Sequence, residues 1–447
     1  SRWEEPFGRS SLEAAANGCL VIISNKGGLP ETITDGITLK NLTEEELFKI
    51  IEKFILDKKL RNTLQRRSLK NFYLTNAFAS EKIDRLRSDI ANSKFVLNYS
   101  KKRLKIINIY NVGQKAFHRL YNISIGKKFT NGFIRNNHDV LEISDRDYVR
   151  NLKTINYISH KHSFKDYMFK TINNYNPDLI IFGHSDNITA EILSDIKEKN
   201  QKILISHWNE DPMMKSVNDS INNLNKISKF NDLVDHSFVT TDPSILLKRD
   251  NQIKNLSFFF VPVDRNIEFN KVYNLNHKYD LFYAMSHGVN RGILKKGKID
   301  ERVIFLSKLI PKLINIKYDF YGYNKIEPIW GNDFYNAIRN SKMGLNLSRG
   351  KPTKYYTSNR IASLIGNGLL TFIDRKTQLD DFFTKDEVIF YNSIEELASK
   401  INFYKKHKKI SNIIASNGRK KYFKSFNEKR ITEYLINKLL GRKDSLL

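Results

Sequence analysis

One stretch of the sequence, residues 343–374, constrains the fold more than any other. It reads MGLNLSRGKPTKYYTSNRIASLIGNGLLTFID. Residues 344–348 have the pattern of a short strand, and a basic loop follows. Ser358 or Asn359 can cap a helix, and Asn367-Gly368 ends it as a left-handed C-cap requires. Residues 369–373 are a nearly continuous apolar run, which predicts a buried strand of a parallel sheet.

The loop within this stretch is basic and leads into the start of the predicted helix. Its cations are Arg349, Lys351 and Lys354, and Arg360 follows in the first turn. Free backbone N–H groups and the helix dipole favour an anion at such a helix start. The sequence therefore predicts an anion site here, with solvated surface charge as the alternative for each cation.

The same unit occurs a second time, at the start of the chain. Residues 5–23 read EPFGRSSLEAAANGCLVII, so that Asn17-Gly18 corresponds to Asn367-Gly368. Both copies predict a helix, an Asn-Gly turn and an apolar strand, which indicates an internal duplication of at least this unit. The first copy carries Glu5 and Glu13, where the second copy has Tyr355 and Ser363.

The first copy resembles a known family. The pattern E-P-F-G-x4-E-A-x-A-x-G, followed by G-G-x-P-E, is similar to the donor-nucleotide half of family 4 glycosyltransferases of GT-B architecture. The resemblance is close over residues 1–40. It implies that Glu5 contacts the donor sugar and that Glu13 contacts the ribose hydroxyls. Since the second copy lacks both acids, it holds the donor differently, takes another donor such as a CMP-linked sugar, or is inactive.

A second resemblance covers residues 104–440 at the level of fold and motif. The segments NRIASLIGNGLLTF, DEVIFY and EEL resemble a divergent branch of GT-B glycosyltransferases related to the spore-coat-maturation type. The resemblance implies two Rossmann-like domains facing a cleft. Family 4 enzymes place an Arg and a Lys on the donor phosphates, in the loop after the strand expected at 280–285. The predicted donor-binding residues are therefore Arg291, Lys295, Arg349, Lys354, Ser358, Asn359 and Arg360, with Glu5 and Glu13 in the first copy.

The order of the predicted elements divides the chain into three parts. Residues 1–95 are expected to form a partial Rossmann-like domain, because the chain starts at Ser1 inside the motif. Residues 80–102 are charged and read as a linker. Strands and helices alternate over 104–265 and again over 277–447, which predicts two α/β domains with parallel sheets. The polar residues 264–278 are expected to be the linker between them.

The most unusual loop, SHWNEDP at residues 206–212, follows a predicted strand. Functional loops of parallel sheets lie at the carboxyl ends of the strands. His207, Glu210 and Asp211 are therefore the predicted catalytic residues, because a carboxylate or histidine there can accept the proton of an attacking hydroxyl. Alternatively, Asp211 merely fixes the turn before Pro212. His184 and Asp186 form a second candidate pair after the preceding strand.

The charge balance favours anionic partners. The chain of 447 residues has 75 Lys and Arg against 48 Asp and Glu, a net charge of +27. Nucleic acid, phosphorylated substrates and anionic membranes all fit such a balance. No RNA-binding motif is present, so we expect no nucleic-acid partner. The basic clusters at 405–409 and 419–424 are either solvated or in contact with anionic lipid head groups.

Together these patterns predict a nucleotide-sugar-dependent glycosyltransferase that builds surface polysaccharide or lipopolysaccharide on a glycan or lipid-linked acceptor. The alternatives are a non-catalytic glycosyltransferase module and a basic protein that binds nucleic acid or other anions. We expect no cofactor and no metal: Asp145 and Asp147 match a D-x-D metal motif, but that motif belongs to the other glycosyltransferase fold. The single Cys19 and the lack of a long apolar run predict a cytoplasmic protein, with peripheral contact at the inner membrane face as an extension.

Overall fold

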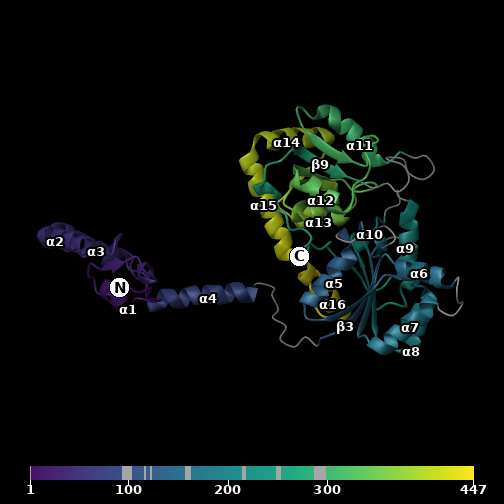
Figure 1. Cartoon of the computed structure of the whole chain (residues 1–447), viewed down its shortest axis with the longest axis horizontal. Helices are drawn as coiled ribbons and strands as arrows, with labels where there is room; N and C mark the ends of the chain where they lie inside the picture. The colour runs from purple at the N-terminus through teal and green to yellow at the C-terminus, as the bar shows by residue number, and fades with distance from the viewer. Residues whose placement is uncertain are drawn as a thin grey trace. The chain divides into compact units, whose positions relative to one another are not determined.

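The computed structural model contains two compact units, Ser1–Lys101 and Lys102–Leu447, coloured along the chain in Figure 1. The structure describes residues 2–92, 103–114, 117–120, 123–156, 163–213, 218–247, 253–285 and 299–446. Each unit has its own hydrophobic core, and each is described separately below.

The smaller unit is built around two short parallel strands. Its elements are α1 (Arg9–Ala16), β1 (Ile22–Ser24), η1 (Leu29–Thr32), β2 (Ile37–Leu39), α2 (Glu44–Leu56), α3 (Lys58–Asn71) and α4 (Asn76–Asn92). Ala15, Val21, Ile23 and Leu29 form its core. Thr43 caps α2 by accepting a hydrogen bond from the N–H of Glu46, as the sequence predicts. Much of the expected linker is helical, because α4 continues to Asn92.

The larger unit contains two parallel sheets. The six-stranded sheet has the order β4-β3-β5-β6-β7-β8 and the five-stranded sheet has the order β10-β9-β11-β12-β13. The strands of the first are β3 (Lys105–Ile109), β4 (Asp139–Ile143), β5 (Leu179–Phe182), β6 (Leu204–Asn209), β7 (His236–Val239) and β8 (Leu256–Phe258). Those of the second are β9 (Tyr279–Ala284), β10 (Tyr318–Tyr321), β11 (Ser341–Asn346), β12 (Leu370–Asp374) and β13 (Ile389–Tyr391).

Helices cover both faces of the six-stranded sheet. They are α5 (Ile125–Arg135), α6 (Asp145–Asn156), α7 (Phe164–Tyr175), α8 (Ala190–Lys199), α9 (Asn218–Phe230) and α10 (Pro243–Leu247). Successive strand residues point to opposite faces, so Ile106 packs in the cluster of α5 and Ile107 packs in the cluster of α7 and α8. Strands buried on both faces explain the continuous apolar runs in the sequence.

The five-stranded sheet has the same construction. Its helices are α11 (Glu301–Leu309), α12 (Gly331–Arg339), α13 (Asn359–Gly366), α14 (Ile394–Lys406) and α15 (Lys408–Ser425), with short 3-10 turns η4 (Val272–Asn274), η6 (Ile310–Lys312), η7 (Arg375–Thr377) and η8 (Leu379–Asp381). Tyr283 packs with α11 and α14, and Phe282 packs with α12 and α13. Two parallel α/β sheets, each covered by helices, confirm the predicted fold class.

The stretch that opened the sequence analysis folds as predicted. Residues 343–374 form the end of β11, a loop, α13 and β12, with Ser358 at the N-cap of α13. Gly368 has φ +83°, a left-handed conformation that glycine adopts without strain. β11 and β12 pair in parallel, with Leu345 opposite Phe372. This places the basic loop and the start of α13 at the carboxyl end of the sheet.

The last helix, α16 (Glu428–Leu439), departs from the predicted boundaries. The sequence division places it in the domain of residues 277–447, but it packs against α5 of the six-stranded sheet, beside which it is drawn in Figure 1. Ile431, Leu435 and Ile436 of α16 share one buried cluster with Phe129 and Phe133 of α5. The apolar face of α16 thus completes the cover of the first sheet.

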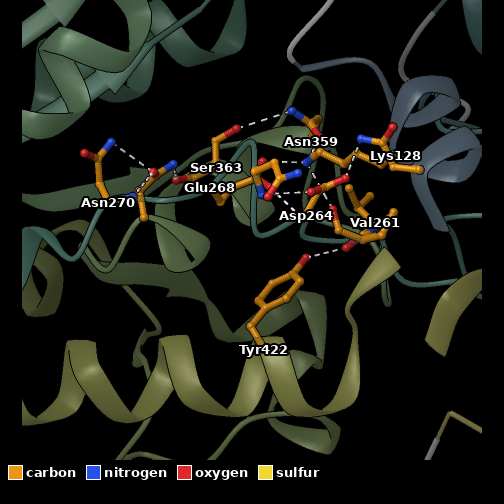
Figure 2. A network of polar contacts seen from close by, with 12 residues as sticks. Lys128, Val261, Asp264, Glu268, Asn270, Asn359, Ser363 and Tyr422 are labelled. Atoms are coloured by element: carbon orange, nitrogen blue, oxygen red, sulfur yellow. Dashed lines mark hydrogen bonds and ion pairs between the residues drawn. The ribbon is translucent and has the colours of Figure 1, made fainter. Parts of the chain in front are cut away.

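The segment 264–278, which was expected to be the linker between the two domains, carries buried polar side chains. Asp264 and Glu268 are fully buried, and Asn270 is nearly so. These polar side chains are satisfied by a network of hydrogen bonds and ion pairs that joins both halves of the larger unit, shown in Figure 2. A polar sequence therefore marks a buried, fully paired junction rather than a solvated linker.

Candidate functional site

A pocket of about 410 Å³ lies between the two halves of the larger unit. Glu210 and Asp211, directly after β6, line it from the six-stranded half. The first turn of α13 and the segment before α12 line it from the five-stranded half. Loops at the carboxyl ends of parallel strands thus meet around one cavity, which is where ligands bind in such folds.

The first turn of α13 supplies a cationic wall. Ser358, Asn359 and Arg360 all line the pocket, as the sequence predicts for donor-binding residues brought together at one helix start. The buried Oγ of Ser358 has no hydrogen-bond partner among the described residues. An unpaired hydroxyl therefore lies at the start of the helix, beside the cavity.

Arg360 is held in place by backbone oxygens rather than by an acid. Its Nη1 donates to the carbonyl oxygen of Leu347 over 2.8 Å and its Nε to that of Ala284 over 3.3 Å. The guanidinium carbon lies 5.3 Å from the ring centre of Tyr283. Within the described ranges no carboxylate pairs with Arg360, and burial lowers the pKa of its guanidinium. A cation in this setting is a ready partner for an anionic ligand.

An apolar wall, which sequence reasoning missed, faces the same cavity. Phe282 within β9, Ile329 and Trp330 before α12, and Phe334 within α12 contribute to it. The guanidinium carbon of Arg119 lies 4.6 Å from the ring centre of Trp330. Such a surface suits a flat or apolar ligand face. The signal in the sequence was PIWGND at residues 328–333, a tryptophan in a Pro- and Gly-containing loop.

The acidic wall is formed by the loop that the sequence singled out. The side chain of Asn209 accepts a hydrogen bond from the N–H of Asp211 over 2.7 Å, so Asn209 fixes the turn before Pro212. No described residue hydrogen-bonds to the carboxylate of Asp211, which lines the pocket. The turn therefore leaves this carboxylate available, which favours the chemical role over the turn-forming one.

Glu210 is paired with His184, not with His207. The Nε2 of His184 lies 2.9 Å from Oε1 of Glu210. Burial alone would lower the pKa of His184, but the hydrogen bond and charge of Glu210, with Asp211, raise this pKa to about 8. His184 has φ +49°, a conformation that is uncommon outside glycine. A strained backbone and a charged pair beside the pocket mark His184 as a functional candidate.

His207 does not reach this pocket in the part of the chain that the structure describes. It lies within β6, is buried, and packs against Phe182 and Phe230. It lines a separate cavity of about 90 Å³, which also touches Asp211. Burial, with the charges of Lys226 and His184, lowers the pKa of His207 to about 3, so its ring is neutral. β6 runs on to Asn209, so His207 lies inside the sheet rather than in the loop expected at residues 206–212.

The remaining predicted residues lie elsewhere. Lys354 pairs with Asp242 over 2.8 Å, and Arg349 is half-buried; neither lines the pocket. Glu5 and Glu13 belong to the smaller unit, where Glu13 is exposed and pairs with Arg9 over 2.8 Å. Arg291 and Lys295 lie outside the described residues. Of the predicted donor-binding residues that the structure describes in the larger unit, those of the first turn of α13 line the pocket.

The two positions that lost an acid in the second copy have different surroundings. Ser363 lines the pocket, and its Oγ accepts a hydrogen bond from the side-chain nitrogen of Asn359 over 3.3 Å. Tyr355 has φ +60°, packs on Phe382 and donates to Asp381 over 2.5 Å. A hydroxyl therefore occupies the place in the pocket that corresponds to Glu13.

The described residues contain no group of three or more His, Cys, Asp or Glu that could hold a metal ion. In the D-x-D segment, Oδ2 of the buried Asp145 accepts hydrogen bonds from Ser185, Asp186 and Asn187, all at 2.9 Å. Its place is therefore structural, holding the loop that carries His184. Over the same ranges, every helix is too short or too polar to cross a membrane.

Histidines with perturbed pKa values predict how stability depends on pH. The pKa of His184 is raised to about 8, so its contribution is complete below the ordinary value of 6.5 and is lost as the pH rises through about 8. Burial lowers the pKa of His207 to about 3 and that of His236 to about 4, so their contributions are lost as the pH falls below 6.5. We expect the melting temperature of the larger unit to peak near pH 6.5. In His184→Gln the alkaline decline should shrink while the acid decline stays; an unchanged alkaline decline would contradict this assignment.

Comparisons with known proteins match both parts of the chain. The family model for group 1 glycosyl transferases matches residues 1–71, and the glycosyl transferase-like family model matches residues 302–437. No curated protein matches the chain. A solved alpha-glucosyltransferase in complex with UDP-glucose and DNA containing an abasic site is 11% identical, with a TM-score of 0.51 over 76% of this chain and 100% of that chain.

A second solved structure, HepE from Anabaena in complex with UDP, is 10% identical, with a TM-score of 0.49 over 76% of this chain and 100% of that chain. The alpha-glucosyltransferase shares the fold of the larger unit. Together with the two parallel sheets around one pocket, these matches support a GT-B, group 1 glycosyltransferase-like protein.

Proposed function

We propose that the 410 Å³ pocket binds a nucleotide sugar and that the larger unit transfers its sugar to an acceptor hydroxyl. One observation carries this proposal: a cation and a carboxylate line the same pocket from opposite halves of the unit. The cation is Arg360 at the start of α13, which pairs with no described carboxylate, and the carboxylate is that of Asp211. A diphosphate needs the first and an attacking hydroxyl needs the second. The alpha-glucosyltransferase of the same fold was solved with UDP-glucose.

The residues divide the work of the reaction between them. Arg360 and the N–H groups of α13 stabilise the charge that develops on the diphosphate when the bond to the sugar breaks. Trp330 and Phe282 offer a flat apolar surface to a ring of the donor. Asp211 takes the proton of the attacking hydroxyl, while Glu210 and His184 hold the neighbouring loop. No step requires Glu13, because Ser363 faces the pocket at that place.

Arg360→Ala should weaken nucleotide-sugar binding strongly. Loss of a charge-assisted contact costs about 1.5–3 kcal/mol, or roughly 10- to 150-fold in affinity. A thermal-shift screen of UDP-, GDP-, ADP- and CMP-sugars identifies the donor, and titration calorimetry then compares the variant with wild type. Lys354→Ala is the matched control, since Lys354 pairs with Asp242 outside the pocket. Unchanged affinity in Arg360→Ala would remove this residue from the site, and a wild-type protein that binds no donor would favour a non-catalytic module.

For the acceptor, we propose a glycan or lipid-linked acceptor of surface polysaccharide or lipopolysaccharide synthesis, reached at an anionic membrane face. The surface that supports this contact lies on α14 and α15, where Lys406, Lys408 and Lys409 are exposed beside exposed Phe403, Ile410 and Ile413. Cations with apolar side chains among them suit a lipid head-group region. Lys408→Glu with Lys409→Glu should abolish co-sedimentation with phosphatidylglycerol vesicles, while equal sedimentation would refute the membrane contact.

The absence of a nucleic-acid partner stays a prediction. The alpha-glucosyltransferase of similar fold was solved with DNA, which is a property of that protein. The basic composition makes weak, salt-sensitive binding to any polyanion easy to detect. A thermal-shift measurement distinguishes a glycosyltransferase from a basic anion-binding protein. The melting temperature of an anion-binding protein should rise no more with a nucleotide sugar than with free phosphate.

A further inference from the structure

One lysine connects the six-stranded half to the wall of the pocket. Lys128 lies on α5, and its side chain is fully buried. Its Nζ contacts three oxygens: Oε1 of Glu268 at 2.6 Å, the carbonyl of Pro262 at 3.0 Å and Oδ1 of Asn359 at 2.9 Å (Figure 2). An ammonium group has three protons to donate, so each proton has a partner. This geometry fixes the position of Nζ from three directions.

The contact with Asn359 determines which way its amide faces. An ammonium group only donates, so the amide oxygen must point to Lys128 and the NH₂ group must point away. The NH₂ group donates to Oγ of Ser363 over 3.3 Å. Asn359 and Ser363 both line the pocket. Lys128 therefore orders two polar side chains of the pocket wall without lining the pocket itself.

Both ends of α13 are tied to the buried segment that follows the six-stranded sheet. Glu268, which pairs with Lys128, also accepts from the N–H of Asp264 over 2.8 Å. At the other end of the helix, Asn270 donates to Oδ1 of Asn367 over 3.1 Å, and Asn367 donates to the carbonyl of Ser363 over 2.8 Å. The position of α13 is thus set by residues of the other half and of the junction.

We propose that Lys128 is a positioning residue of the donor pocket: it acts through Asn359 to fix the first turn of α13 in the orientation that binds the donor. The proposal rests on the proposed function only in naming a nucleotide sugar as the ligand. It assigns to α5 a part in donor binding, because a shift of α5 moves Nζ and with it the amide of Asn359.

A double-mutant cycle tests whether Lys128 acts through Asn359. The probe is whichever of UDP-, GDP-, ADP- or CMP-sugar raises the melting temperature of the wild type. We expect Lys128→Met to weaken its binding about tenfold, but less than about twofold in the Asn359→Ala background. An equal loss in both backgrounds would overturn the proposal. Should Lys128→Met not fold, Lys128→Met with Glu268→Gln removes both charges and enters the same cycle.

Arg135→Met is the matched control. Arg135 also lies on α5 and pairs across the junction with Asp264 at 2.9 Å and Glu428 at 2.5 Å. Its loss should lower the melting temperature and leave donor affinity within about twofold. Weakening of donor binding by Arg135→Met as large as that by Lys128→Met would reduce Lys128 to a general stabilising role.

Hydrogen exchange gives a readout that needs no donor. Lys128→Met should speed amide exchange over residues 358–363, and Arg135→Met should not, because only Lys128 contacts Asn359. If the wild type binds none of the four sugars, the proposed function fails and this measurement alone decides on Lys128. Unchanged exchange over 358–363 in Lys128→Met would refute the proposal whatever the donor.

Discussion

Asp211→Asn is expected to lower kcat by about 10²- to 10⁴-fold, the usual contribution of a general base. The substitution keeps the size of the side chain and removes only its ability to accept a proton. The turn should persist, because it depends on the N–H of Asp211 and the side chain of Asn209. Donor affinity and melting temperature should therefore stay close to those of the wild type. Turnover is measured with the donor found by the thermal-shift screen.

Two comparisons make this result interpretable. Asp195→Asn removes a carboxylate of α8 that pairs with Lys165 and lies outside the pocket, so its kcat should be unchanged. Glu210→Gln breaks the charged pair with His184 and should shift the pH profile more than the maximum rate. Near-normal turnover in Asp211→Asn, or a joint loss of stability and activity, would show that Asp211 is not the base.

Glu268→Ala should destabilise the larger unit by about 3–5 kcal/mol, the cost of leaving a buried charge without its partner. The ammonium of Lys128 and the carboxylate of Glu268 are both fully buried, so neither can turn to water. The N–H of Asp264 loses its acceptor in the same variant. Urea unfolding of the full chain, followed by fluorescence of the buried Trp208, measures the change.

The neighbouring pair Lys127 and Glu142 provides the contrast. It lies on the same helix and the adjacent strand, at 3.2 Å, but both side chains keep contact with solvent. Glu142 also accepts a hydrogen bond from the hydroxyl of the buried Tyr110 over 2.7 Å, so Glu142→Ala should cost about 1–2 kcal/mol, which is still below the cost of Glu268→Ala. A loss in Glu268→Ala no larger than that in Glu142→Ala would mean that water enters the junction and pairs with Lys128.

The sequence predicted the sheets because their signals are local. A strand buried on both faces must be apolar throughout, and the Asn-Gly turns end helices for backbone reasons alone, as Gly368 shows. The buried faces of helices that also carry many charged residues were harder to predict. The basic clusters at 405–409 and 419–424 predict surface that is solvated or in contact with lipid, but Tyr422 within the second cluster, on α15, is fully buried and donates to the carbonyl of Val261. Its burial depends on the junction, which no local pattern encodes.

The pocket was predictable in part for the same reason. Asn359, Arg360 and Asp211 stand at the ends of predictable elements, so their convergence follows from the topology of a parallel sheet. Phe282 was missed because an aromatic residue within a strand is usually a core residue, and Trp330 because a single aromatic residue in a loop has no periodic pattern. The choice between His207 and His184 depended on where β6 ends, a boundary that the pairing of Asn209 with Val239 sets. Lys128 could not be found from sequence, because its partners lie far along the chain.

The return of α16 to α5 has a consequence for how the protein is made. During synthesis the six-stranded sheet emerges well before residues 428–439. Phe129 and Phe133 therefore stay uncovered until the apolar face of α16 packs against them. Domains normally fold as units in the order of their synthesis, but here the first half can be completed only after the second has been translated. The nascent chain therefore carries an exposed aromatic surface until α16 leaves the ribosome, and loss of that helix alone would make the first half prone to aggregate.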